Sequence, residues 1–121
     1  MTGLRGSVFD LGRVWRAFGY SAAGFRAGWQ QAAFRQEVVL VLVLAPLGAW
    51  LGKSGLERAL LIGSILLVPL VELLNTAVEM AIDRIGPERH ALSGQAKDLG
   101  SAAVVIAIVI AVITWTLILW P

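Results

Sequence analysis

Apolar residues gather in three long runs along this chain, and a stretch that mixes arginines with aromatic residues precedes them. The runs fall within residues 35–52, 56–85 and 97–120. A helix needs about 20 mostly apolar residues to cross a bilayer, so each run can form a transmembrane helix. The pattern predicts an all-α membrane protein with three transmembrane helices, of which the second is longer than the bilayer requires.

Residues 8–34 instead predict an amphipathic N-terminal helix. Their apolar side chains recur at spacings of three and four, and the arginines fall outside that apolar set. The apolar positions are Leu11, Val14, Trp15, Phe18, Ala22, Phe25 and Trp29, and the arginines are Arg13, Arg16 and Arg26. The pattern is typical of a helix in the membrane interface, although a helix packed on its own protein would show it too. Gly19 and Gly24 would allow a break into two shorter helices.

The composition favours a membrane protein and excludes thiol chemistry. Of the 121 residues, 58% are hydrophobic, so the polar residues are too few to cover a soluble surface. We expect a single membrane domain over residues 1–121, with no signal peptide in residues 1–7. The chain has no cysteine, which excludes disulfides and thiolate metal sites.

The segment between the second and third spans carries helix stop and start signals. Gly86 and Pro87 should end the second helix. Ser93 is the expected N-cap of the third helix.

Basic residues predict how the chain is oriented in the membrane. They concentrate before the first span and after the second, whereas only Lys53 and Arg58 stand near the turn between those spans. The N-terminal set is Arg5, Arg13, Arg16, Arg26 and Arg35, and the later set is Arg84, Arg89 and Lys97. Lys and Arg are in excess on the cytoplasmic side of membrane proteins. We therefore expect a cytoplasmic N-terminus and a C-terminus on the far side.

One face of the second predicted span is polar. At 3.6 residues per turn, Glu72, Asn75, Thr76, Glu79 and Asp83 share that face. An ionisable group in the bilayer centre costs about 2.5–3.5 kcal/mol on insertion scales, so such groups usually face a protein interior and mark function. The alternative is a helix that has already left the lipid and presents a solvated acidic face.

The polar face and its neighbours suit phosphoryl transfer. Glu72, among apolar residues that favour its neutral form, could act as general base for a lipid hydroxyl, and Glu79 could hold Mg²⁺ together with substrate phosphates. Lys97 near a helix start could bind phosphate with help from the arginines at 13 and 16, since this reaction needs mainly positioning and charge stabilisation. Neither of the glycine-rich phosphate-binding motifs of soluble kinases and nucleotide-binding folds is present. Alternatively, Lys97 and Asp98 are an interfacial anchor and a helix-start acid.

Several segments together carry a family resemblance. Residues 72–84 (ELLNTAVEMAIDR) contain a Glu-x-x-Asn-x-Ala-x-Glu motif, and residues 90–104 (HALSGQAKDLGSAAV) contain Ala-Lys-Asp. The sequences at 19–21, 32–37 and 111–115 match as well. Over nearly the whole chain, from about Arg13 to Trp120, these segments resemble the bacterial integral-membrane diacylglycerol kinases.

The resemblance implies an activity and an assembly. It implies a homotrimer of three-span subunits in the bacterial inner membrane, with an interfacial helix and active sites shared between subunits. It also implies that ATP and Mg²⁺ serve to phosphorylate a diacylglycerol hydroxyl, which gives phosphatidic acid.

The same resemblance implies roles for individual residues. The family's catalytic base matches Glu72, the amide of its motif matches Asn75, and its metal-binding glutamate matches Glu79. The expected nucleotide contacts are Arg13, Tyr20, Glu79, Glu88, His90, Lys97 and Asp98. Besides Glu72, the positions expected near the lipid substrate are Ser101 and Trp115.

Two other functions compete with this interpretation. An undecaprenol kinase would use the same chemistry on a polyprenol. A small non-enzymatic transporter or scaffold would explain an intramembrane Glu72 as an ion or substrate site, but it would not explain why Glu79, Lys97 and Asp98 gather at the same face.

One position departs from the family pattern and generates a prediction. The family usually has a glutamate as second metal ligand where this chain has Gln31, which offers a carbonyl oxygen without the charge. We expect Gln31→Glu to lower the magnesium concentration needed for half-maximal activity, because a carboxylate attracts the cation more strongly than an amide. Magnesium titrations of wild type and variant measure this effect, and an unchanged magnesium dependence would contradict the hypothesis.

Overall fold

The computed structural model describes residues 8–120, and these form four α-helices and no strand. The helices are α1 (Leu11–Trp29), α2 (Ala32–Leu51), α3 (Gly55–Ile85) and α4 (Ala91–Leu119). Arg5 and the expected absence of a signal peptide in residues 1–7 lie outside this range. The predicted all-α class is confirmed.

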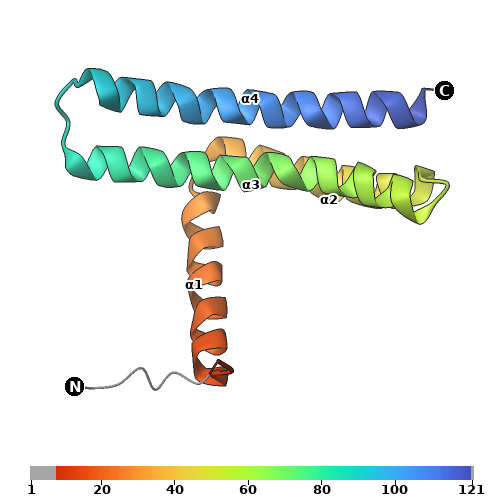
Figure 1. Cartoon of the computed structure of the whole chain (residues 1–121), viewed down its shortest axis with the longest axis horizontal. Helices are drawn as coiled ribbons and strands as arrows, with labels where there is room; N and C mark the ends of the chain where they lie inside the picture. Colours follow the sequence, from red (N-terminus) through yellow and green to blue (C-terminus); the bar gives the residue numbers. More distant parts are fainter. Residues whose placement is uncertain (1–7, 121) are drawn as a thin grey trace.

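Helices α2, α3 and α4 form a bundle, and α1 projects from it (Figure 1). α3 packs against both α2 and α4, so it is the central helix. Each of these three helices is long and apolar enough to cross a membrane, which confirms the three predicted spans. The 31 residues of α3 measure about 46 Å, longer than the hydrocarbon core of about 30 Å. One end of α3 therefore reaches beyond the lipid tails.

The bundle buries several polar residues and leaves most of its apolar side chains exposed. Leu61 is the one large side chain fully buried among the described residues, whereas most leucines, valines and isoleucines of the spans are exposed. The buried polar residues are Ser64, Glu72, Asn75 and Thr76, all on α3. Lipid tails can solvate the apolar surface, but they offer no hydrogen bonds, so polar groups gain by facing the protein.

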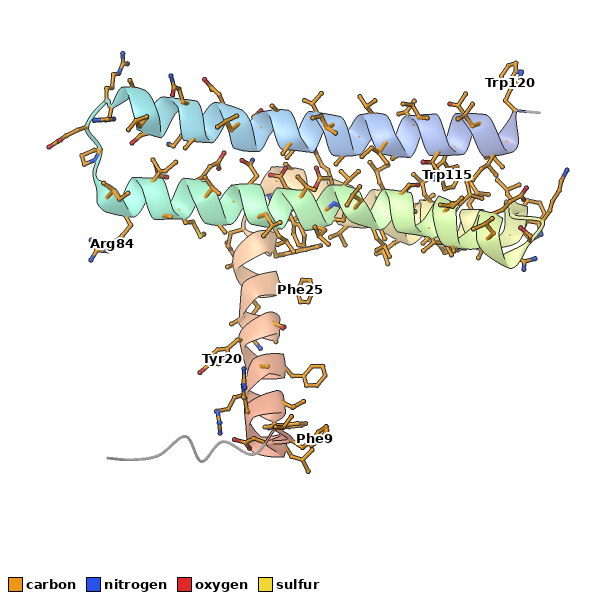
Figure 2. The ribbon with its side chains drawn as sticks, in the orientation of Figure 1. Phe9, Tyr20, Phe25, Arg84, Trp115 and Trp120 are labelled. Atoms are coloured by element: carbon orange, nitrogen blue, oxygen red, sulfur yellow. The ribbon has the colours of Figure 1, made fainter. Side chains whose placement is uncertain are left out.

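α1 is one continuous helix, so Gly19 and Gly24 do not break it. Its N-cap is Asp10, whose carboxylate accepts the backbone N–H of Arg13 at 3.2 Å. Tyr20 and Phe25 point to opposite sides of the helix (Figure 2), as its amphipathic sequence predicts. The other end of α1 is anchored at Gly28, where an added Cβ would lie 2.7 Å from the Leu73 side chain of α3.

Local hydrogen bonds define the two other helix junctions. Between α2 and α3, the hydroxyl of Ser54 accepts the backbone N–H of Glu57 at 3.1 Å, and the carboxylate of Glu57 accepts the N–H of Lys53 at 2.7 Å. At the start of α4, His90 is the N-cap because its Nδ1 accepts the N–H of Leu92 at 3.1 Å. The expectation that Ser93 caps this helix is therefore wrong, since α4 begins at Ala91, three residues earlier than that cap would allow.

A contact between three helices closes the bundle at the end that holds the α2–α3 turn. The indole N–H of Trp115 on α4 donates to the carbonyl of Leu61 on α3 at 3.0 Å, and Figure 2 shows Trp115 turned toward α3. A Cβ added at Gly48 of α2 would lie 3.1 Å from Leu61 Cβ and 3.4 Å from the Trp115 ring. Trp115 thus packs between the helices.

This contact predicts that Gly48→Val destabilises the bundle. The added methyl groups have no room, and overpacking of this kind typically costs about 1–3 kcal/mol. Thermal unfolding of the detergent-solubilised protein measures the effect. Gly63→Val is the matched control, because an added Cβ at Gly63 meets nothing within 4 Å in this chain. Equal unfolding temperatures for the two variants would contradict the proposed packing.

Candidate functional site

The centre of the candidate site is the polar face of α3. Glu72 and Asn75 each retain 9% of their exposure and Thr76 retains 6%, so these three side chains face the bundle and not the lipid. Glu79 is half-buried and Asp83 is exposed, so the same face opens gradually toward the end of the helix. The face that the sequence predicted thus runs from a buried carboxylate to a solvent-accessible one.

Glu37 on α2 adds a carboxylate that sequence reasoning did not assign to the site. Its charge lies close enough to interact with that of Glu72, and its Oε2 atom is buried without a hydrogen-bond partner. It lines a cavity of about 260 Å³ that is otherwise walled by apolar side chains of α2, α3 and α4. The signal in the sequence that could have found it is a glutamate directly beside the apolar run of the first span.

Asn75 lies at a close approach of α4 to α3. A Cβ at Gly100 of α4 would overlap the amide oxygen of Asn75, so only glycine fits this position without movement. That oxygen is buried and has no hydrogen-bond partner in the chain. A buried polar atom without a partner is uncommon, and a catalytic role or a bound water or ion is among the explanations for one.

The α3–α4 junction forms a hollow of about 460 Å³, which we call the loop hollow. It is lined by Ile82, Asp83, Gly86, Pro87, Glu88, Arg89, His90, Ala91, Ser93, Gly94 and Lys97. The loop hollow thus brings together three of the predicted nucleotide contacts, which are Glu88, His90 and Lys97. Asp83 and Arg89 also line it, although sequence reasoning gave neither of them a site role.

Charged groups connect the loop hollow to the buried part of α3. The ammonium of Lys97 donates to Asp83 Oδ1 at 2.8 Å, which links α4 to α3. The carboxylate of Glu79 is close enough to interact electrostatically with both Glu72 and Lys97. A base candidate and an acidic metal-ligand candidate therefore lie on one face of α3, and a cation of α4 lies beside the end of that face.

The other predicted site residues do not line the loop hollow. Tyr20 is 75% exposed on α1, and Arg13 lines a separate shallow hollow formed by α1 and the residues just before it. Asp98 and Ser101 are exposed, and Gln31 is the half-buried N-cap of α2. Trp115 lies at the opposite end of the bundle, where it contacts Leu61.

The acidic residues of one chain do not form a complete metal cage. Within residues 8–120, no three His, Asp or Glu side chains are placed to hold an ion together. Mg²⁺ needs only one or two protein carboxylates when substrate phosphates supply further ligands. The half-buried Glu79 fits that requirement, because it lies between the buried base candidate and the cation.

The arrangement suits a reaction between a membrane-soluble and a water-soluble reactant. Glu72 lies inside the bundle, whereas the loop hollow lies at the end of α3 and carries the cations of Arg89 and Lys97 beside the carboxylates of Asp83 and Glu88. Asn75 and Glu79 lie between these two places on the same helix face. Proton abstraction and phosphate stabilisation can thus occur along one line of residues.

Comparison with known proteins identifies related sequences. Residues 19–119 match the family described as prokaryotic diacylglycerol kinase. The chain is 55% identical to the diacylglycerol kinase of Escherichia coli K12 over 109 residues, which cover 89% of each chain. It is 50% identical to the diacylglycerol kinase of Pseudomonas aeruginosa over 110 residues, covering 90% of this chain and 89% of the relative. The Helicobacter pylori 26695 diacylglycerol kinase is 41% identical over 107 residues, covering 88% of this chain and 80% of the relative.

Proposed function

Because this chain belongs to the prokaryotic diacylglycerol kinase family, we propose that it transfers phosphate from ATP to diacylglycerol and forms phosphatidic acid. The observation that carries the proposal most directly is the polar face of α3, which leads from the buried Glu72 to the water-accessible loop hollow. A lipid alcohol and a nucleotide could meet along this face. A soluble substrate pair would not need a base buried in a membrane bundle.

In the proposed reaction Glu72 is the general base. Its carboxylate takes the proton of the acceptor hydroxyl as the oxygen attacks the γ-phosphorus of ATP, and ADP leaves with the electrons of the broken P–O bond. Asn75 would hydrogen-bond the reacting groups: it lies one turn from Glu72, and its unpaired buried amide oxygen can accept while its amide NH2 can donate. Ser101 and Trp115 contribute contacts to the lipid.

The cation and nucleotide are held nearer the water. We assign Mg²⁺ to Glu79, with Gln31 as a weaker second ligand, and the ion when bound would neutralise charge on the phosphates. Glu88, His90 and Lys97 bind the nucleotide from the loop hollow. Asp98 would contribute from the exposed side of α4, and Glu79 would contact the nucleotide through its metal.

The complete site requires more than one subunit. Arg13 and Tyr20 lie on the projecting helix α1, apart from the loop hollow of their own chain. A homotrimer would bring α1 of one subunit to the α3 face of another, and it would also cover part of the exposed apolar surface. We place this assembly in the bacterial inner membrane, with α1 in the interface and the N-terminus in the cytoplasm, where ATP is available.

The first test is Glu72→Gln, which keeps the side-chain shape but cannot accept the proton. We expect phosphate transfer to fall by about 100- to 10,000-fold, the usual contribution of a general base. Transfer from labelled ATP is measured in mixed micelles that contain diacylglycerol or undecaprenol. Glu57→Gln, at the other end of α3, is the matched control and should retain wild-type activity.

The acceptor lipids separate the possible outcomes of this test. Transfer mainly to undecaprenol would keep the mechanism and change the substrate. No transfer by folded wild-type protein to either lipid would contradict the kinase proposal and favour the transporter or scaffold function.

Subunit mixing tests whether sites are shared. Arg13→Ala and Glu72→Gln should each impair activity when all subunits carry the same change. Mixed oligomers should recover part of it, because Arg13 from one subunit can combine with Glu72 from another. Activity assays after unfolding and joint refolding of the two variants measure the recovery. Mixed samples no more active than the average of the separate variants would contradict a shared site.

A further inference from the structure

The ion pair between Asp83 and Lys97 connects the end of α3 with the start of α4. Its 2.8 Å separation makes it the shorter of the two ion pairs that residues 8–120 form, the other being Asp10–Arg16 at 3.8 Å. Both Asp83 and Lys97 line the loop hollow. The pair thus belongs to the wall of the hollow where we place the nucleotide.

We propose that Asp83 is a positioning residue, which holds the Lys97 ammonium at the wall of the loop hollow so that it meets the phosphates of the nucleotide. This inference rests on the proposed function, because it assumes that an anionic nucleotide binds there. Asp83 does not itself contact the phosphates. It acts through Lys97.

The geometry leaves Lys97 able to bind a phosphate while Asp83 holds it. A lysine ammonium has three N–H donors, and Asp83 Oδ1 accepts one of them. The remaining donors can point toward a phosphate oxygen. Without Asp83 the long lysine side chain would sample many rotamers, and binding would have to fix it each time.

The exposure of the ion pair indicates whether Asp83 orients Lys97 for the nucleotide or competes with the nucleotide for Lys97. The side chains of Asp83 and Lys97 keep 67% and 43% of their exposure, so water screens their attraction and the pair is weak. Such a pair biases the rotamer of Lys97 without competing effectively against a multiply charged polyphosphate.

A double-mutant cycle tests the inference in the purified full chain in mixed micelles. We expect Asp83→Ala to raise the KM for ATP about two- to fivefold, the range for losing an exposed ion pair. The kcat and the KM for diacylglycerol should change less than twofold, because neither the base nor the lipid contacts are altered. Lys97→Met should have a larger effect, and adding Asp83→Ala to it should change nothing further.

Conservative variants separate positioning from a general structural role. Asp83→Glu keeps the charge and should restore most of the ATP affinity, whereas Asp83→Asn keeps only the acceptor oxygen and should restore less. Glu57→Gln, which removes a carboxylate at the opposite end of α3, is the matched control with an unchanged KM for ATP. The Asn variant also replaces the Ala variant if the latter fails to fold.

Three results would overturn the inference. The first is a lower KM for ATP in Asp83→Ala, which would indicate that Asp83 competes with ATP for Lys97. The second is a loss of activity confined to kcat. The third is additive effects of Asp83→Ala and Lys97→Met on the KM for ATP. Calorimetric titration with ATP, without lipid, measures the dissociation constant for ATP of the wild type, the two single variants and the double variant, and so tests the same cycle by binding alone. A wild type that binds ATP but phosphorylates neither lipid would contradict the proposed function, while the binding cycle would still decide the role of Asp83.

Discussion

A helix that crosses lipid cannot leave carboxylates and amides facing hydrocarbon, because the tails offer no hydrogen bonds and do not solvate charge. α3 meets this constraint by turning Glu72, Asn75 and Thr76 toward its neighbours. Its position between α2 and α4 follows from the same need, since two helices cover the polar face better than one. The contact of Gly100 with Asn75 shows how closely α4 must approach.

The two ends of the bundle differ in what holds them together. At the end with the α2–α3 turn, Trp115, Leu61 and Gly48 join three helices by close packing and one hydrogen bond. At the other end, α3 and α4 are joined by an exposed ion pair beside an open hollow. The packed end can keep the helices in register, and the open end leaves room for a charged ligand. The close-packed contact between the helices and the charged hollow thus lie at opposite ends of α3.

The projecting helix α1 explains why one chain holds only part of the candidate site. Gly28 allows its C-terminal end to pack closely on Leu73, but the rest of the helix leaves the bundle. Its aromatic side chains remain exposed in the single chain, as do most apolar side chains of the spans. Lipid and further copies of the chain are the partners that can cover such surfaces. The family assignment and the separation of Arg13 from the loop hollow both support our proposal of a shared site.

The sequence by itself determined that this protein is embedded in lipid and which helices it forms. Long apolar runs require the bilayer, and the 3.6-residue period placed Glu72, Asn75 and Glu79 on one face of a span without any knowledge of neighbouring helices. The three membrane-spanning helices could be predicted for that reason, and specific motifs identified the family. Local signals were less decisive, because several residues near position 90 could cap a helix and the chain uses His90 instead of Ser93.

Only the tertiary structure decided which polar groups meet. Glu37 lies 35 residues before Glu72 in the sequence, and nothing in its own helix pattern shows that α2 brings the two charges together. The Asp83–Lys97 pair depends on how the α3–α4 junction folds back, and the contact of Trp115 with Leu61 spans 54 positions. Helical periodicity is local information, whereas these contacts depend on which faces of separate helices pack together.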